Sequence, residues 1–363
     1  MNQRDEDVET TNELAILEKR IENELSGWGV KINIEVTPPE IEKLFELGTD
    51  IHVDDGVRTT ADRKGHGLQR AMVFALLRSW ASALQMERQV DEEREVVARR
   101  QSDSVIFAME EPELFLHPHA QRRLSASLRE ISQTPEHQVF LCTHSTHFVE
   151  LEYYREILII SKDDPEIGSE VRQCTKELFE GDGFAEKKQQ FHMAQWINPD
   201  RGEMFFARRV VFVEGETEKV VLPYLAEKMD IHDPDVSIID CGSKFNIPLY
   251  ITIAKAFSLQ YMVVHDEDPL PNPLPENWSE EKTESKRRTF RLNEKIAEMV
   301  EGPLGEVVVM SPDFEKSSGV TQSQGDRKGK ALAALDHFEG MQIDDILNDV
   351  KSLVVASYRQ PAQ

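Results

Sequence analysis

The sequence predicts an α/β protein whose strands form parallel sheets. Two apolar runs carry this prediction, Val210–Val213 and Tyr261–Val264, because short continuous runs of β-branched and aromatic residues are typical of strands covered on both faces. A helical pattern lies between them, and strands that alternate with helices favour a parallel sheet. A further run of this kind, Val105–Met109, indicates a second α/β domain in the first half of the chain.

Length and composition fit two domains of ordinary size. The chain has 363 residues, of which 39% are hydrophobic, enough for two proper cores. No apolar run reaches the length of a membrane span and the N-terminus is polar, so we expect neither a span nor a signal peptide. The three cysteines, Cys142, Cys174 and Cys241, have no metal or disulfide spacing, which favours a reducing cytoplasm.

We place the domain boundary near residue 203, which divides the chain into residues 1–202 and 203–363. The stretch before this point, from Asp163 to Arg201, is polar and irregular. In the second domain, the proline-rich loop Pro269–Trp278 introduces a helical insertion that ends before Val307.

The first domain begins with a polar stretch and then shows regular patterns. Glu13–Leu25 has helical periodicity, and Val30–Val36 alternates as a strand does. The pattern of residues 68–160 predicts a helix, a strand, a second helix and then two further strands, in that order along the chain.

Carboxylates follow both apolar runs of the second domain. Glu214 stands at the tip of the first strand, and Gly215 lets the chain turn into a helix that Thr217 can cap. Glu218 falls in the first turn of that helix, so both glutamates can face one point beyond the sheet.

The second apolar run ends in three acidic residues. If the strand continues through them, its alternation places Asp266 and Asp268 on one side and Glu267 on the other. Carboxylate oxygens gathered at strand ends suit Mg²⁺ or Mn²⁺, and these ions drive phosphodiester chemistry. Taken singly, acidic residues at a helix start also complement the helix dipole, and the aspartates also fit a solvated turn before Pro269.

The two motifs together resemble the Toprim domain, which topoisomerases, primases, recombination-repair proteins and the OLD (overcoming lysogenization defect) family nucleases share. The resemblance implies that Glu214, Asp266 and Asp268 bind metal, and that Glu218 is the further acidic residue of the OLD branch. Gly242 falls where Toprim domains turn after their second strand.

Two later segments fit the OLD branch. After the expected strand Val307–Met310, Glu315 matches a late acidic metal ligand of these nucleases, with Asp313 as a substitute. Lys330 matches a lysine that neutralises charge on the phosphate, although Ala331 replaces the proline that usually follows. The alternative is that Lys330 is a solvated lysine at a helix start.

The first domain resembles an ABC-type ATPase. The strand Val105–Met109 leads into a Walker B-like segment, in which Glu110 takes the Mg²⁺-linked position and Glu111 the position of the base that orients water. Leu116, His117 and Pro118 complete a pattern typical of OLD-type ATPases. His144, which follows the next buried strand, matches the switch histidine that senses the γ-phosphate; a core histidine is the alternative.

A degenerate ABC signature precedes these motifs. Gly65, Gly67 and Gln69 stand where a Ser-x-Gly-x-Gln pattern usually lies, ahead of an expected helix Leu68–Ala83. The N-terminus of that helix could face the phosphate of a partner's nucleotide, which implies a homodimer. A glycine hinge before a core helix is the alternative.

The net charge of −25 opposes nonspecific binding to DNA, since such binding depends on Lys and Arg meeting phosphates. Bound cations would offset part of this charge at the metal site. Two local basic segments also exist, one at residues 282–291 and one at Arg327, Lys328 and Lys330. The first segment is equally explained as an exposed helix face, and DNA affinity could instead depend on a further N-terminal region or a partner protein.

The resemblance implies a partial ABC-type ATPase domain, followed by a Toprim domain that cleaves DNA with two Mg²⁺ or Mn²⁺ ions about 3.5–4 Å apart. Phage defence or DNA repair is the implied role. One rival is a non-catalytic DNA-binding or regulatory dimer. Another is a topoisomerase or primase, for which the chain shows neither a nucleophilic tyrosine setting nor a zinc module.

The first prediction concerns ATP. No G-x-x-x-x-G-K-[ST] phosphate loop occurs, and the stretch Gly325–Lys330 lacks both its spacing and its hydroxyl residue. We therefore expect this chain alone not to hydrolyse ATP, with nucleotide use only when a further N-terminal region completes the site. Phosphate release by the pure chain, compared with its Glu111→Gln variant, measures this; release that the substitution abolishes would contradict it.

Overall fold

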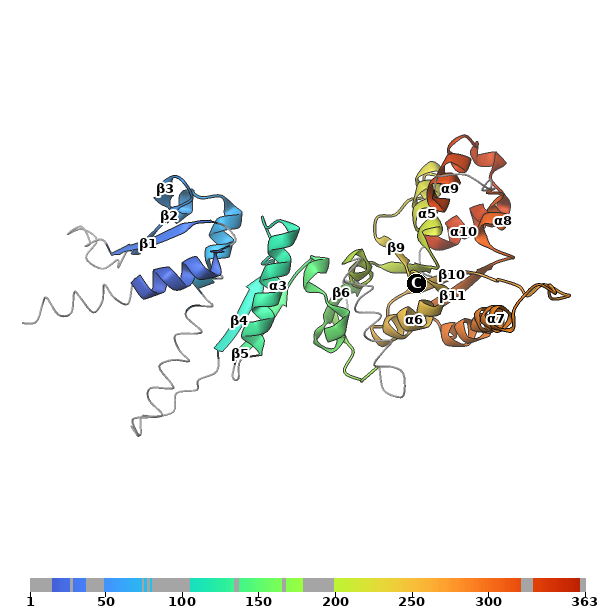
Figure 1. The fold of residues 1–363 in the computed structure, drawn as a ribbon, viewed down its shortest axis with the longest axis horizontal. Helices are drawn as coiled ribbons and strands as arrows, with labels where there is room; N and C mark the ends of the chain where they lie inside the picture. Colours follow the sequence, from blue (N-terminus) through green and yellow to red (C-terminus); the bar gives the residue numbers. More distant parts are fainter. Residues whose placement is uncertain are drawn as a thin grey trace, which may run out of the picture. The chain divides into compact units, whose positions relative to one another are not determined.

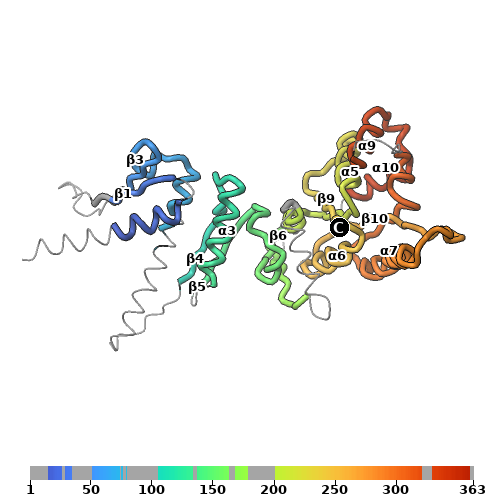
Figure 2. Tube along the Cα trace, viewed as in Figure 1, coloured from blue at the N-terminus to red at the C-terminus, as the bar shows by residue number. Residues whose placement is uncertain are grey.

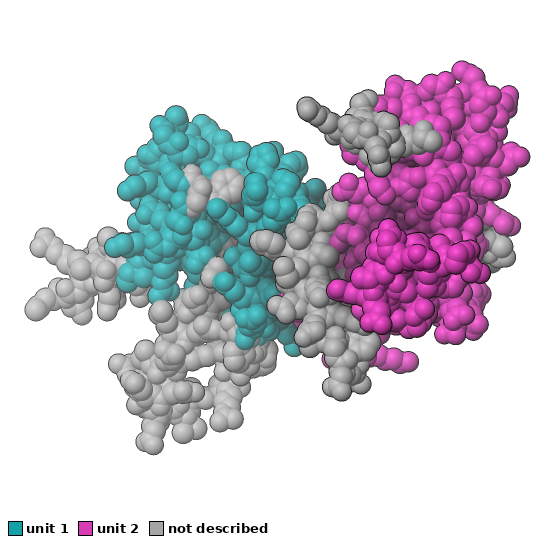
Figure 3. All heavy atoms as spheres, turned by 45° about the vertical axis from the view of Figure 1, so that its right-hand side comes forward, with its two compact units in different colours: residues 1–148 teal, residues 149–363 magenta. Residues whose placement is uncertain are grey.

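The structure is a computed structural model that describes residues 15–26, 29–36, 49–73, 75–76, 79, 105–133, 137–164, 168–178, 199–320 and 329–359. The chain divides into two compact units, Met1–Phe148 and Val149–Gln363 (Figure 3). The domain boundary expected near residue 203 stays a prediction. In space, Leu151, Tyr154 and Cys174 already pack into the core of the second unit.

The first unit contains a small antiparallel sheet in the order β1 (Lys31–Val36), β2 (Thr49–Asp54), β3 (Arg58–Thr60). The predicted strand Val30–Val36 is thereby confirmed. Helical residues 15–24 and 66–73 flank this sheet and share one core with it. That core contains Ile21, Leu25, Ile32, Ile34, Val53, Leu68 and Met72.

The same unit holds a parallel pair of strands, β4 (Val105–Glu110) and β5 (His137–Cys142), joined by α3 (Pro118–Ser132). Leu124, Leu128 and Ile131 on one side of α3 pack against Phe107. The register sets Glu110 opposite Cys142, so both strands end at one edge.

The second unit opens with an antiparallel hairpin of β6 (Leu158–Asp164) and β7 (Gly168–Gln173). Its main sheet is four-stranded and entirely parallel, in the order β11-β10-β8-β9. The strands are β8 (Arg209–Val213), β9 (Val236–Asp240), β10 (Tyr261–Asp266) and β11 (Gly305–Met310).

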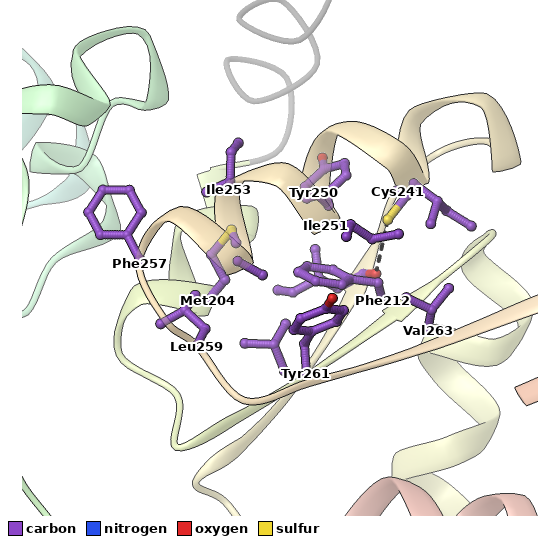
Figure 4. Packing of buried hydrophobic residues seen from close by; sticks show 14 of the residues in the cluster. Met204, Phe212, Cys241, Tyr250, Ile251, Ile253, Phe257, Leu259, Tyr261 and Val263 are labelled. Atoms are coloured by element: carbon purple, nitrogen blue, oxygen red, sulfur yellow. Dashed lines mark hydrogen bonds between the residues drawn. The ribbon is translucent and has the colours of Figure 1, made fainter. Parts of the chain in front are cut away.

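Helices cover both faces of this sheet. Val210 and Phe212 of β8 face α6 (Ile247–Ala256) and α7 (Glu280–Val300), in the core drawn in Figure 4. Val211 and Val213, one residue out of phase, face α5 (Glu216–Lys228) and α10 (Asn348–Tyr358). The continuous apolar run of β8 is therefore explained by a strand buried on both faces.

The helices of the second face come from distant parts of the sequence. The α5 helix packs against α9 (Lys330–Glu339), with α10 beside it, as Figures 1 and 2 show. The predicted helical insertion before Val307 is confirmed as α7, whose N-cap Ser279 accepts a hydrogen bond from the backbone of Lys282.

Strand order reverses direction between β8 and β10. From β8 the chain crosses by α5 to β9 on one side, and then by α6 to β10 on the other side of β8. In open parallel sheets such a reversal leaves a crevice outside the carboxyl ends of the two strands, where ligands bind. Glu214 follows β8 and Asp266 ends β10, so the carboxylates singled out by the sequence lie at this point.

Two helix starts differ from expectation. The helix after β8 begins at Glu216 with Gly215 as its N-cap, so Thr217 lies in the first turn and does not cap it. The helix expected to begin at Leu68 begins at His66, and its expected end at Ala83 lies outside the described residues.

None of the helices in the described part of the chain combines the length and apolar character that a membrane span requires.

The second prediction concerns the β10–β11 pair. Gly305 lies opposite Tyr261, and a Cβ atom at this position would stand 2.6 Å from both Cζ and Oη of the tyrosine. We expect Gly305→Ala to lower the free energy of unfolding by about 1–3 kcal/mol, the usual cost of overpacking. Urea denaturation measures the change.

A matched control exists at Gly340, where an added Cβ would meet nothing within 4 Å. Gly340→Ala should leave stability nearly unchanged, while Gly305→Ala combined with Tyr261→Phe should recover part of the loss. Equal effects at both glycines would show that contact with Tyr261 does not limit position 305.

Candidate functional site

Glu214 and Glu218 lie side by side at the end of β8. Glu214 directly follows the strand and is partly buried, and Glu218, in the first turn of α5, is only 5% exposed. Gly215 lies between them as the N-cap of α5, and a Cβ there would make only an ordinary van der Waals contact, 3.8 Å from the Glu218 carboxylate. The sequence-based placement of both glutamates is confirmed.

Asp266 is the last residue of β10 and links three segments. Its carboxylate accepts a hydrogen bond of 2.7 Å from the backbone N–H of Phe314. Its own backbone N–H donates to the Glu214 carboxylate at 3.3 Å. The ends of β8, β10 and the segment after β11 are thus tied together through this residue.

Asp268 reaches the site differently from the expected strand alternation, because β10 ends at Asp266. Asp268 has a left-handed backbone conformation with φ of 51°, and its N–H donates to the carbonyl of Pro312. Glu267 does point away, as expected, with its carboxylate on the hydroxyl of Ser311.

The late acidic segment forms a short helix, α8 (Phe314–Ser318). Asp313 is its N-cap: its carboxylate accepts from the N–H of Lys316 and pairs with the Lys316 ammonium at 2.5 Å. These contacts engage Asp313 locally, whereas Glu315 interacts with charges of the site. The geometry therefore favours Glu315 over Asp313 as the late acidic residue.

Lys330 joins the same group from a separate helix. It is the first residue of α9, and its ammonium lies 3.1 Å from the Glu315 carboxylate with 67% of the side chain exposed. The pKa of Lys330 is raised, first by this contact, and the charges of Asp266 and Glu218 contribute. Lys328 and Arg327 lie outside the described residues.

Two further cations lie at the site. In the sequence, Lys244 was missed and Lys286 was noted only as part of the basic segment at residues 282–291. Lys244 belongs to the short helical turn η7 (Lys244–Asn246) and is 1% exposed; its ammonium donates to the carbonyl of Asp266 and to the Asp268 carboxylate. Lys286 of α7 lies 3.6 Å from the other oxygen of Asp268. In the sequence, only the position of Lys244 just after the turn at Gly242 hinted at this role.

The carboxylates repel one another and are poorly solvated. Burial raises the pKa of Glu218 to about 8, and the charges of Asp266, Glu214 and Glu315 add to this rise. Burial likewise raises the pKa of Asp266 to about 7, with a further contribution from Glu214. The pKa of Glu214 is also raised, mainly by burial, although Lys244 opposes the rise.

This donor set fits a hard divalent cation. The five candidate ligands all offer carboxylate oxygen, which Mg²⁺ and Mn²⁺ prefer. A bound cation would relieve the repulsion that adds to the raised pKa values of Glu214, Glu218 and Asp266. In the described residues, no group of three or more His, Cys, Asp or Glu side chains is arranged so that it could hold a metal ion as it stands. The site is therefore a candidate on its chemistry and position.

The residues predicted for a nucleotide site in the first unit also meet at strand ends. Glu110 ends β4, and Glu111 follows it with a φ of 44°. The His144 ring lies after β5, with Nε2 3.6 Å from the Glu111 carboxylate and 82% of the side chain exposed. His144 is thus not a core histidine, although its switch role stays a prediction.

Glu113 holds this arrangement and was missed in the sequence. One oxygen of its carboxylate accepts from the hydroxyl of Thr143 at 2.7 Å and from the N–H of His144 at 2.8 Å. The loop after β5 is therefore fixed against the loop after β4.

The glycine segment starts a helix, as predicted, but differs in detail. Gly65 precedes the helix, and its carbonyl accepts from the N–H groups of Leu68 and Gln69. Gly67 lies inside the first turn. The Gln69 amide donates to the carbonyls of Asp62 and Lys64, so it braces the preceding turn. Whether this segment meets a nucleotide stays a prediction.

The basic segment at residues 282–291 divides between two kinds of contact. Arg287 and Arg291 both pair with Glu284 on the surface of α7, at 3.9 and 3.3 Å. Lys286 reaches Asp268, and Arg288 lies over the ring of Phe245, which follows Lys244 in η7. Lys282 lies over the Trp278 ring.

Comparisons with known families match one region in each half of the chain. Residues 1–149 match the AAA ATPase domain family, and residues 205–268 match the TOPRIM domain of overcoming lysogenization defect protein-like proteins. With the parallel sheets, these matches confirm the predicted fold class, an ATPase-type part followed by a Toprim domain.

Two curated proteins are similar to this chain. The OLD nuclease of Thermus scotoductus is 27% identical over 293 residues, which cover 79% of this chain and 51% of that protein. The Old nuclease of Escherichia phage P2 is 27% identical over 252 residues, which cover 68% and 40%. The chain spans about half the length of the curated relatives it matches.

Among solved structures, one described for ATP-driven dimerization of SMC ATPases covers 50% of this chain and 94% of its own, at 11% identity and a TM-score of 0.31. A likeness this low carries no argument.

The third prediction concerns Glu218. Its pKa of about 8 in the folded protein, against 4.5 when exposed, means that the metal-free fold loses stability as pH rises between these values. We expect Glu218→Gln in EDTA to raise the melting temperature at pH 8.5 by about 4 °C or more, the shift that 1–2 kcal/mol gives in such a domain. Thermal melts by circular dichroism measure it.

At pH 5 the increase in melting temperature from Glu218→Gln should be less than half of that at pH 8.5, because Glu218 is protonated in the folded wild type at pH 5. Glu216→Gln, an exposed neighbour in the same turn, is the control and should change the melting temperature little. A gain that does not depend on pH would contradict the burial of charge at Glu218.

Proposed function

We propose that this chain, which belongs to the overcoming lysogenization defect (OLD) family, carries the catalytic domain of a metal-dependent DNA endonuclease. One observation supports this most: Glu214, Glu218, Asp266 and Glu315 belong to three separate segments and meet at the switch point of the parallel sheet. Such a concentration of carboxylates, of which Glu218 is buried and the others are partly buried, destabilises the metal-free fold, which argues for a use in binding cations.

The residues that would hold the ions are those that share this position. They are Glu214, Glu218, Asp266, Asp268 and Glu315. Two bound Mg²⁺ or Mn²⁺ ions would supply an activated water and stabilisation of the leaving oxygen, the chemistry by which phosphodiesters are hydrolysed. The backbone N–H of Phe314 holds the carboxylate of Asp266, and the backbone N–H of Asp266 holds that of Glu214.

Lys330 is our candidate for balancing charge on the phosphate. Its ammonium is exposed, begins α9, and is anchored beside the carboxylates by Glu315. A phosphate that gains negative charge would be stabilised by a cation already held at this place.

Substrate binding is assigned to the site-facing side of α7. Lys286 and Arg288 lie near Asp268 and Phe245, and their charges are not taken up by Glu284, unlike those of Arg287 and Arg291. These contacts support a local basic surface in a chain whose net charge of −25 opposes DNA binding.

The first unit is assigned a regulatory role. Glu110, Glu111 and His144 form part of a nucleotide site, and Gly65, Gly67 and Gln69 are the candidate signature for the site of a second copy in a homodimer. ATP would bind only where a further N-terminal region or partner protein completes the pocket. A cytoplasmic nuclease in phage defence or DNA repair is the role that this assembly favours.

The fourth prediction tests the metal site. Asp266→Ala should reduce nicking of supercoiled plasmid in Mg²⁺ or Mn²⁺ by at least about a hundredfold, the scale of losses when a key electrostatic group is removed. The loss is expected because Asp266 joins both strand ends of the site. Conversion to open-circle or linear DNA, followed on gels with EDTA as a blank, is the measurement.

Glu267→Ala is the matched control, since this adjacent carboxylate points to Ser311 and should leave cleavage nearly unchanged. Retained activity in Asp266→Ala would refute the site. A wild-type chain that binds DNA but cleaves with neither metal would favour the rival, a non-catalytic DNA-binding or regulatory module.

A further inference from the structure

Lys244 is a buried lysine that the proposed chemistry does not use. It opens η7, just after the turn that follows β9, and its side chain is 1% exposed. Its ammonium donates to the backbone carbonyl of Asp266 and to the carboxylate of Asp268, with Nζ 3.3 Å from Oδ2. The charge of this lysine therefore lies at the carboxyl end of β10, although the lysine itself follows β9 in the chain.

A buried ammonium group needs opposite charge nearby, because its removal from water is otherwise strongly unfavourable. Asp268 supplies that charge directly. Lys244 thus pairs directly with one of the five candidate ligands, and through the backbone carbonyl of Asp266 it also holds the strand end that carries a second.

Two other lysines reach the carboxylates from the surface. Lys330 pairs with Glu315 and Lys286 with Asp268, and their side chains are 67% and 45% exposed. Long exposed lysines return to water easily, so they can move when an ion or phosphate arrives. Lys244 is enclosed, so its charge stays at the site.

We propose that Lys244 is a positioning residue that serves as a permanent cation of the metal site. It holds the carboxylate of Asp268, and it stands in for part of the positive charge that divalent ions bring. The inference rests on the proposed function, because it concerns the same carboxylates. Exchangeable ions are then held chiefly by the four carboxylates that do not pair directly with the lysine, those of Glu214, Glu218, Asp266 and Glu315.

This role predicts two opposite effects when the charge is removed. Without metal, the carboxylates lose their internal counter-charge, so the fold becomes less stable. With metal, a cation that competes for the same carboxylates is gone, so divalent ions bind more tightly. If Lys244 only filled space, its replacement would lower the stability of the fold and the affinity for metal together.

The experiment compares the full chain with Lys244→Met and Lys244→Gln. Mn²⁺ affinity by titration calorimetry should increase about tenfold in both variants, equivalent to about 1.4 kcal/mol. Melting temperatures in EDTA should fall in both variants. Saturating Mn²⁺ should raise the melting temperature of the variants by more than it raises that of the wild type. Lys244→Gln keeps donors for Asp266 and Asp268, so it covers the case in which Lys244→Met does not fold.

Lys228 offers a matched control at the other end of α5. Its ammonium donates to the carbonyls of Phe338 and Glu339, at 2.7 and 3.3 Å. Lys228→Met should lower the melting temperature and leave Mn²⁺ affinity unchanged. Lys244→Arg retains the charge and should bind Mn²⁺ within about threefold of the wild type.

Each outcome decides the inference. Mn²⁺ binding that is unchanged or weaker in both uncharged variants overturns it, whatever the cleavage assay gives. If the wild type binds no Mn²⁺ while the variants do, the role of Lys244 is supported and the proposed metal-dependent function fails. If none of the proteins binds Mn²⁺, both are overturned.

Discussion

Burial of the carboxylates at the ends of β8 and β10, to which their mutual repulsion adds, is the constraint on which the second unit depends. Burial raises the pKa values of Glu218 and Asp266 to about 8 and about 7, so at neutral pH these side chains carry charge only at a cost. The sheet beneath them is buried on both faces, and burial of apolar surface there supplies the stability that offsets this cost. Lys244 and Lys330 add positive charge from opposite sides of the cluster.

Connectivity explains why the carboxylates meet. The order β11-β10-β8-β9 makes β8 and β10 neighbours although about fifty residues separate them in sequence. Each strand ends in an acidic residue, and the crossovers α5 and α6 leave on opposite faces. The segment after β11 then brings Glu315 to the same edge, since β11 pairs with β10 and the N–H of Phe314 binds Asp266. The chemistry of the site is therefore a consequence of strand order.

The first unit uses the same device on a smaller scale. The paired strands β4 and β5 end together, so Glu111 and His144 come within 3.6 Å of each other, and Glu113 ties their loops. The chain spans about half the length of the curated relatives it matches, which is why nucleotide use is proposed for the assembled site and not for these residues alone.

The sequence by itself determined the parallel strands, the acidic residues at their ends and the helical insertion, because apolar periodicity and turn residues act locally. It placed Glu214, Glu218 and Asp266 correctly for that reason. It misjudged Asp268, which has a left-handed backbone and contacts Lys244 and Pro312 instead of continuing the strand, and it passed over Lys244 and Glu113. Only the tertiary structure decided these features. Contacts such as the pair of Lys244 and Asp268 join residues whose separation along the chain gives no signal in the sequence.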